Sequence, residues 1–370
     1  MKVVWVRFVS FKLRGLRRVP TGAAFVLAGF VAAGSSIALG ESKPSKSGSD
    51  VETIKVVAHP IAAFDREDAG KTRFGKLTWR GGLVLTSPSL NFGGWSGLAL
   101  DAEGKKLFAL SDAGTWMTGE IAYAGGKPAG LESVRLGPIR SLSGKTLHRK
   151  RDHDAEGLAL VKGSPEKGSV LISFERKHRI GRFDIGEDGL SAALSYVDLP
   201  AAARSMKANR GIEAVAVLRG GPYKGSLVAL AENLPDPSGN HTGWLWVKDK
   251  PLAFHLTNPA DFDITDAAGL PDGSLLVLER RFRWNEGVKA RLRLIRRDEL
   301  QPGSRIEGET LLEAGMSREI DNMEGLAVHT GPAGEIIVTM ISDDNFNRLL
   351  QRTLLLQFAV DGADLAHARP

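Results

Sequence analysis

The feature that most constrains the fold of this chain is a short phrase that recurs five times. Each copy is one polar residue followed by small and apolar residues, as in the run at 324–328. The polar residues are Ser96, Glu156, Glu213, Asp266 and Glu324, so successive copies lie 60, 57, 53 and 58 residues apart. A nearly constant interval of this length is typical of a radial array of β-rich units, such as a propeller.

Each copy is followed, after a turn, by a second apolar run that ends in an acid. These closing acids are Asp112, Glu175, Glu232, Glu279 and Asp343. Further short runs complete each unit, and residues 291–295 alternate between basic and apolar side chains, as a half-buried strand does. Long amphipathic helical patterns are missing from the sequence. We therefore predict an all-β chain that folds as a β-propeller of five or six four-stranded blades.

The two ends of the repeat region complement each other. The last unit shows only three strand-like runs, at 326–328, 336–341 and 352–360. Two β-type runs, at 54–58 and 77–85, precede the first full unit, and an N-terminal strand of this kind could supply the fourth strand. Pairing these segments in one sheet would close the ring and remove the exposed sheet edges that an open array has to protect.

The first 40 residues predict an export signal. Six basic residues and no acid occur before residue 19, and an apolar segment rich in Gly and Ala follows at 22–39. Small residues at 38–40 offer a cleavage site. The alternative is an uncleaved membrane anchor, because the segment is close to the lower length limit for spanning a bilayer. Cleavage would place the protein in the periplasm or outside the cell.

The remaining chain divides into a linker and one domain. Residues 41–50 are polar, with nothing to bury, and are predicted to be a disordered linker. Residues 51–370 are predicted to be a single propeller domain. The whole chain has 49 basic and 43 acidic residues, so loss of the six basic residues of the signal leaves 43 of each. A domain without net charge has no field to attract nucleic acid, and we expect no nucleic-acid partner.

Cysteine, serine and histidine often carry chemistry in enzymes, but their number or spacing in this sequence does not indicate a catalytic or metal site. The absence of cysteine suits an oxidising compartment and excludes thiolate metal sites and cysteine nucleophiles. Ser96 lies in a Gly-Trp-Ser-Gly phrase, but Leu98 breaks the Gly-x-Ser-x-Gly spacing of a nucleophile elbow. The histidines lack the paired spacing of zinc ligands. The following tryptophans are expected to pack between blades: Trp79, Trp95, Trp116, Trp244, Trp246 and Trp284.

The recurring acids predict a charged site. In an antiparallel pair the start of one strand lies beside the end of the next, so each opening acid should approach the closing acid of its unit. In a radial array all these pairs would meet around one mouth of the axial channel. Like charges about 4 Å apart repel by about 4 kcal/mol at an effective dielectric of ~20, so neutralising groups are required. The candidates are nearby Arg and Lys side chains and calcium, which takes oxygen ligands.

Several segments together show a family likeness, at 92–100, 154–158, 174–176, 211–214, 278–282, 322–326 and 342–345. They resemble the phytase-like family of exported bacterial proteins, described by an esterase-like activity of phytase. The likeness covers residues 75–360. It implies a phytase-like β-propeller domain exported to the periplasm or beyond, and it favours phosphoester hydrolysis.

Three hypotheses for function follow. The first is a calcium-assisted hydrolase of phosphate monoesters that takes a small, anionic, phosphate-bearing substrate. The second is a metal-dependent propeller hydrolase acting on a lactone or sugar, and the third is a non-catalytic envelope propeller whose acids are structural. We expect a monomer with no stable membrane insertion after signal cleavage.

The first hypothesis assigns a role to each charged residue. Glu213 and Glu324 would be catalytic. The predicted metal ligands are Glu156, Glu175, Glu232, Asp266, Glu279 and Asp343. The predicted phosphate-binding residues are Arg176, Arg210, Arg280 and Arg281.

Overall fold

The computed structural model describes residues 50–360 and Leu365. Almost all regular structure is β-strand, apart from the four-residue helix α1 (Lys150–His153) and the 3₁₀ helix η1 (Ala201–Ser205). The predicted export signal and nearly all of the predicted linker lie outside the described residues. Residues Ser49–Pro370 form one compact unit. Within the described part of the chain, no helix has the length and apolar character needed to cross a membrane.

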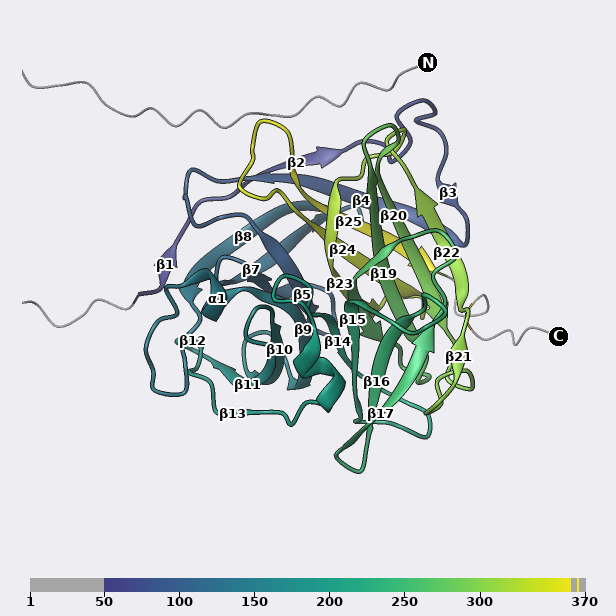
Figure 1. Ribbon diagram of the computed structural model, residues 1–370. Helices are drawn as coiled ribbons and strands as arrows, with labels where there is room; N and C mark the ends of the chain where they lie inside the picture. The colour runs from purple at the N-terminus through teal and green to yellow at the C-terminus, as the bar shows by residue number, and fades with distance from the viewer. Residues whose placement is uncertain (1–49, 361–364, 366–370) are drawn as a thin grey trace, which may run out of the picture. The chain divides into compact units, whose positions relative to one another are not determined.

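The strands form five sheets arranged as the five blades of a β-propeller, which confirms the predicted fold class (Figure 1). Blade 1 contains β5 (Trp95–Leu100), β6 (Lys106–Ser111), β7 (Thr115–Ala124), β8 (Lys127–Pro138) and β1 (Glu52–Thr53). Blade 2 contains β9 (Ala155–Gly163), β10 (Gly168–Phe174), β11 (Arg179–Gly186), β12 (Gly189–Leu190) and β13 (Ser195–Tyr196). Blade 3 contains β14 (Ile212–Val217), β15 (Leu227–Pro235), β16 (His241–Val247), β17 (Lys250–Leu256) and β21 (Arg305–Ile306).

Blade 4 contains β18 (Asp263–Gly269), β19 (Leu275–Arg283), β20 (Gly287–Ile295) and β22 (Glu309–Ala314). Blade 5 contains β23 (Asn322–Thr330), β24 (Ile336–Asp343), β25 (Thr353–Val360), β4 (Leu77–Thr86), β2 (Val57–Ile61) and β3 (Arg73–Phe74). Blade 5 therefore joins both ends of the domain. β4 pairs antiparallel with β25 from Leu85 opposite Thr353 to Leu77 opposite Val360, as predicted (Figure 1).

The first strand of each blade lines the axial channel. These inner strands, β5, β9, β14, β18 and β23, lie side by side in a closed ring in that order. Their apolar side chains, among them Leu98, Leu158 and Val215, fill the channel and leave a cavity of about 30 Å³. That volume holds only about two waters. We call the end where the inner strands begin the mouth.

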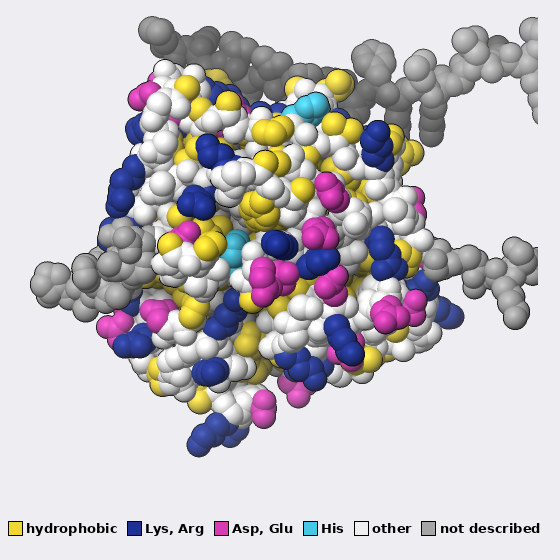
Figure 2. All heavy atoms as spheres, turned by 180° about the vertical axis from the view of Figure 1, so that it is seen from behind, with side chains coloured by type: hydrophobic (Ala, Val, Ile, Leu, Met, Phe, Trp, Pro, Cys, Tyr) yellow, Lys and Arg dark blue, Asp and Glu magenta, His cyan; other side chains and the backbone are white. Residues whose placement is uncertain are grey.

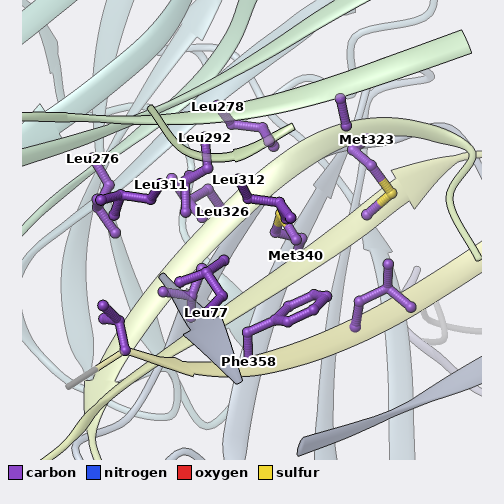
Figure 3. Close-up of a cluster of buried hydrophobic side chains, with 14 of the residues drawn as sticks. Leu77, Leu276, Leu278, Leu292, Leu311, Leu312, Met323, Leu326, Met340 and Phe358 are labelled. Carbon is purple, nitrogen blue, oxygen red and sulfur yellow. The ribbon is translucent and has the colours of Figure 1, made fainter. Parts of the chain in front are cut away.

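The core lies between neighbouring blades. Figure 3 shows the packing of blade 4 against blade 5, where Leu276, Leu278 and Leu292 meet Met340 and Phe358. Trp95 and Trp116 are also fully buried, as predicted. Trp284 contradicts the prediction because its side chain is 90% exposed at the hairpin between β19 and β20.

Candidate functional site at the mouth of the channel

A β-bulge near the start of each inner strand sets the geometry of the mouth. In β14, Ile212 pairs with Ala231 and Ala214 with Leu230, so Glu213 between them is unpaired. An extra residue in one strand turns its side chain away from the regular alternation. The corresponding residues in chain order are Ser96, Glu156, Glu213, Thr265 and Glu324.

The bulge in β18 corrects the prediction for Asp266. Thr265 occupies the bulge, and Asp266 lies one residue further along, paired with Leu278. The Asp266 carboxylate is fully buried and accepts hydrogen bonds from the backbone N–H groups of Ala267, at 2.8 Å, and Leu326, at 2.7 Å. Burial raises the pKa of Asp266 well above its ordinary value. Asp266 therefore links blades 4 and 5 through the backbone, and the prediction that it is a metal ligand at the mouth is wrong.

Ser96 and Thr265, the two hydroxyl residues at the bulge positions, also join neighbouring blades. The Ser96 Oγ donates to the carbonyl of Ala155 at 2.8 Å, and the Thr265 Oγ1 donates to the carbonyl of Met323 at 3.1 Å. Both contacts run from one inner strand to the next. Ser96 and Thr265 thus hold the ring together where the other three blades carry glutamates.

The bulge at Thr265 also moves Glu279 away from the position predicted for it at the mouth. It pairs with Ile264, so it lies one residue before the position taken by Glu175 and Glu232 in their blades. Its carboxylate is fully buried between Arg291, at 2.7 Å, and Arg293, whose Nε lies 2.8 Å away. The prediction that Glu279 is a metal ligand is wrong, because both of its oxygens are bound to guanidinium groups inside the blade.

Four of the predicted acids do meet at the mouth. Oxygens of Glu175, Glu213 and Glu232 lie within 4.8 Å of one another, and Glu156 forms a second group with Glu175 and Asp154. The backbone N–H of Gly211 donates to Glu175 at 3.0 Å and to Glu213 at 3.3 Å. The mouth side of blades 2 and 3 therefore carries five converging carboxyl groups. Asp154 was missed, although it stands two residues before Glu156 in the sequence.

The pKa values reflect this crowding. Burial raises the pKa of Glu156 and of Glu213 well above the ordinary value, and neighbouring carboxylates raise both further. Burial, with a smaller effect of Asp263, raises the pKa of Glu232 to about 7. Burial also raises the pKa of Glu175, to which the Glu213 carboxyl donates a hydrogen bond. Ionising all of these carboxyl groups together is therefore unfavourable unless a cation neutralises their charge.

The mouth continues onto blades 5 and 1. Burial raises the pKa of Glu324, although the Arg280 guanidinium opposes this effect. Burial, followed by the charge of Glu324, raises the pKa of Asp343 to about 8. The pKa of Asp112 is raised mainly by burial, and Lys150 opposes the shift. Glu324 and Asp343 thus lie in the same electrostatic environment, as the repeat predicts.

Four cations adjoin these acids. Arg176 forms an ion pair with Asp154, Arg280 with Glu324 at 3.4 Å, and Arg210 with Glu232 at 3.9 Å. Lys150 of helix α1 lies 3.3 Å from Asp112 and 3.4 Å from Asp154. The sequence does not predict Lys150 at this site, because only the fold brings the loop before β9 over blade 1.

Arg281 does not belong to this group. Its guanidinium donates to Glu286 at 2.7 Å and to the carbonyl of Ala260 at 2.9 Å, away from the mouth acids. The predicted phosphate-binding role for Arg281 therefore lacks support from its position. Arg280, one residue earlier, stands in the position that carries the closing acid in other blades.

The set can hold a hard cation. Eight acids adjoin only four cations, so the mouth keeps an excess of negative charge when all groups ionise; the acids are Asp112, Asp154, Glu156, Glu175, Glu213, Glu232, Glu324 and Asp343. All candidate ligand atoms are oxygens, which calcium and magnesium prefer. The convergence of five carboxyl groups on blades 2 and 3 fits calcium, which accepts six to eight oxygens in flexible geometry.

One family of known proteins matches most of the sequence. A sequence model of the phytase-like family, described as esterase-like activity of phytase, matches residues 90–346. Among solved structures, the "Dos1 propeller" aligns over 76% of this chain and 75% of its own, at 10% identity and a TM-score of 0.32. The Cps50 (Swd1) β-propeller domain of Myceliophteria thermophila aligns over 85% of this chain and 97% of its own, at 10% identity and a TM-score of 0.35. No curated protein matches the sequence.

Proposed function

The chain belongs to the phytase-like family, and we propose that its acidic mouth binds calcium and hydrolyses phosphate monoesters. The observation that carries the proposal is the set of five converging carboxyl groups on blades 2 and 3, with Arg and Lys side chains beside them. Carboxylates alone would repel a phosphate ester. A mouth with carboxylates for a cation and guanidinium groups for phosphoryl oxygens can bind one.

The residues of the mouth divide into two roles in binding. Asp154, Glu156, Glu175 and Glu232 would hold the calcium ion, which when bound supplies positive charge to stabilise the phosphoryl oxygens. Arg176, Arg210 and Arg280 line the same acids and would orient the phosphoryl group through charged hydrogen bonds.

Proton transfer falls to Glu213 and Glu324. In hydrolysis the oxygen of water bonds to phosphorus, the ester P–O bond breaks, and the leaving alcohol takes up a proton. Glu324, which Arg280 holds toward its ionised form, would accept the proton from water. Glu213, with its raised pKa, would donate the proton to the leaving oxygen.

Calcium calorimetry and phosphate release test this proposal. We expect calcium to bind and the protein to release phosphate from a generic aryl phosphate only when calcium is present. Calcium binding without phosphate release would instead favour a lactone- or sugar-acting hydrolase. Absence of both would favour a non-catalytic envelope propeller.

Glu213→Gln and Glu324→Gln test the catalytic assignment. Each change removes a proton-transfer group and keeps its shape, so kcat should fall by roughly 10²–10⁴-fold. Glu187→Gln, in the exposed turn between β11 and β12, is the matched control and should leave kcat unchanged. Folded Glu213→Gln and Glu324→Gln proteins with full activity would overturn the assignment.

We also propose that residues 1–40 direct export to the periplasm or beyond and that the mature protein is a monomer. Basic residues followed by an apolar segment support the first part of this proposal. Fractionation of the producing cells and N-terminal sequencing of the mature chain test export. Sedimentation velocity tests the monomer.

A further inference from the structure

Exposed apolar side chains are distributed unevenly over the described part of the chain. Trp284 is 90% exposed and Leu349 is 95% exposed. Eight of the twelve large hydrophobic side chains classed as exposed lie on segments at the mouth end: Leu90, Leu142, Phe282, Trp284, Met316, Phe346, Leu349 and Leu350. The other four lie on the outer parts of blades: Val57, Leu194, Tyr196 and Leu252.

The propeller topology places those eight residues on one side. Connections between the second and third strands of a blade, and those leading to the next inner strand, all emerge at the mouth. Trp284 and Leu349 lie on connections of the first kind, and Leu90 and Met316 on connections of the second kind. Among the described residues, the turns at the opposite end carry none of the exposed large hydrophobic side chains.

The apolar residues are held in place by the loops that carry them. The Arg348 guanidinium donates to the carbonyls of Ser87, at 3.0 Å, and Ser89, at 2.7 Å. This joins the loop of Leu349 to the loop of Leu90. The hairpin of Trp284 is closed by the bond from Arg281 to Glu286 at 2.7 Å. The apolar tips therefore stay exposed on anchored loops.

Basic residues share this side of the domain. Four exposed ones lie on the connections before β9 and β14 and form no ion pair within residues 50–360: Lys145, Arg149, Arg204 and Lys207. The mouth acids of the same side are largely buried and adjoin cations of their own, while Asp236 and Asp261 lie on neighbouring loops and the exposed Asp198 lies on the connection before β14. The outermost layer of the mouth side is thus apolar on blades 4, 5 and 1 and basic beside blades 2 and 3.

We propose that the mouth side of the propeller docks on an anionic phospholipid surface. The tips at Trp284, Leu349 and Leu350 enter the headgroup region, where Trp and apolar side chains partition favourably. The basic loops face the lipid phosphates, which attract Lys and Arg side chains near an anionic surface. Docking of this kind is peripheral, goes beyond the proposed phosphoesterase activity and does not depend on it.

Local fluorescence tests the orientation, and the natural absence of cysteine makes labelling specific. We would introduce Trp284→Cys, Leu349→Cys or Asp188→Cys separately into the full chain and attach an environment-sensitive dye. Vesicles of phosphatidylglycerol should shift the emission of labels at 284 and 349 to the blue. The label at 188, in a turn at the opposite end, should not shift. No shift at 284 and 349, or an equal shift at 188, would overturn the proposal.

Vesicle sedimentation measures the strength of docking. Combined Trp284→Ser, Leu349→Ser and Leu350→Ser changes should weaken binding to phosphatidylglycerol vesicles roughly tenfold or more, because three inserted side chains lose their apolar burial. Leu252→Ser, on the outer strand of blade 3, is the matched control and should bind like the unchanged protein. Equal binding by the triple variant, or equally tight binding to phosphatidylcholine, would contradict the proposal. Neither outcome bears on the proposed phosphoesterase activity, which is measured separately as phosphate release in solution without vesicles.

Discussion

At the scale of single residues, two carboxyl groups of similar burial have opposite roles. Asp266 satisfies two backbone N–H groups, one of them on the next blade, whereas Glu213 shares its surroundings with other carboxylates. Removing Asp266 leaves buried donors without partners, whereas changing Glu213 to Gln leaves one fewer ionisable group among crowded carboxyl groups. Burial alone therefore does not show whether an acid is structural or functional.

The variants Asp266→Ala and Glu213→Gln separate these roles. Asp266→Ala should lower the free energy of unfolding by about 1–3 kcal/mol, because the Leu326 N–H loses its acceptor, with calcium binding retained. Glu213→Gln should keep or raise stability in the absence of calcium and weaken calcium binding. Chemical denaturation and calorimetry on both proteins measure the two effects. Loss of calcium binding in folded Asp266→Ala would return that residue to the metal site.

At the scale of elements, the β19–β20 pair explains why blade 4 departs from the repeat. Glu279 pairs with Arg291 across the two strands, and Arg293 reaches the same carboxylate. Arg280 takes the position of the closing acid in this blade, and Glu279, one residue earlier, is part of a buried ion-pair network. The hairpin beyond this network also carries Trp284 out into solvent.

Glu279→Gln tests this network. It leaves two buried guanidinium groups without a counter-charge, and we expect a loss of about 3–5 kcal/mol in the free energy of unfolding. Glu286→Gln, whose ion pairs with Arg281 and Lys289 are more exposed, should lower the free energy of unfolding much less than Glu279→Gln. Urea denaturation of both proteins provides the measurement. Equal losses in the free energy of unfolding would mean that the buried ion pairs of Glu279 contribute no more to stability than the exposed ion pairs of Glu286.

At the scale of the whole molecule, five blades bring acids from distant parts of the chain to one mouth. The ring of inner strands and the pairing of β4 with β25 hold them there against their mutual repulsion. Protonation is one means of reducing this repulsion, and cation binding is another. Stability of the whole domain should therefore respond to pH and to calcium together.

The pH dependence has a defined sign. Glu232 and Asp343 have pKa values of about 7 and about 8 in the folded protein, above the ordinary values of 4.5 and 3.8. Their contribution to stability is fully present below about pH 4 and is lost as the pH rises through 7 and 8. Without calcium, the melting temperature should fall between pH 5 and pH 9, by about 2–4 °C per kcal/mol lost.

Calorimetric melts at several pH values, with and without calcium, measure this effect. Calcium should raise the melting temperature most at high pH, where the carboxylates are ionised. The double variant Glu232→Gln and Asp343→Asn should reduce both the pH slope and the calcium effect. A melting temperature independent of pH from 5 to 9 would show that these carboxyl groups do not carry the expected shifts.

The sequence by itself determined the period, the all-β class, the closing role of an N-terminal strand and the acids at Glu156, Glu175, Glu213 and Glu232. These follow from local patterns that repeat, and a repeat is visible without coordinates. The five-blade count, the helix that brings Lys150 to the mouth and the true positions of Asp266 and Glu279 required the tertiary structure. The physical reason is register: a bulge or a shift of one residue turns a strand's side chains to the other face. Such a shift depends on which residues pair between strands. Similarity between segments of the sequence does not reveal that pairing.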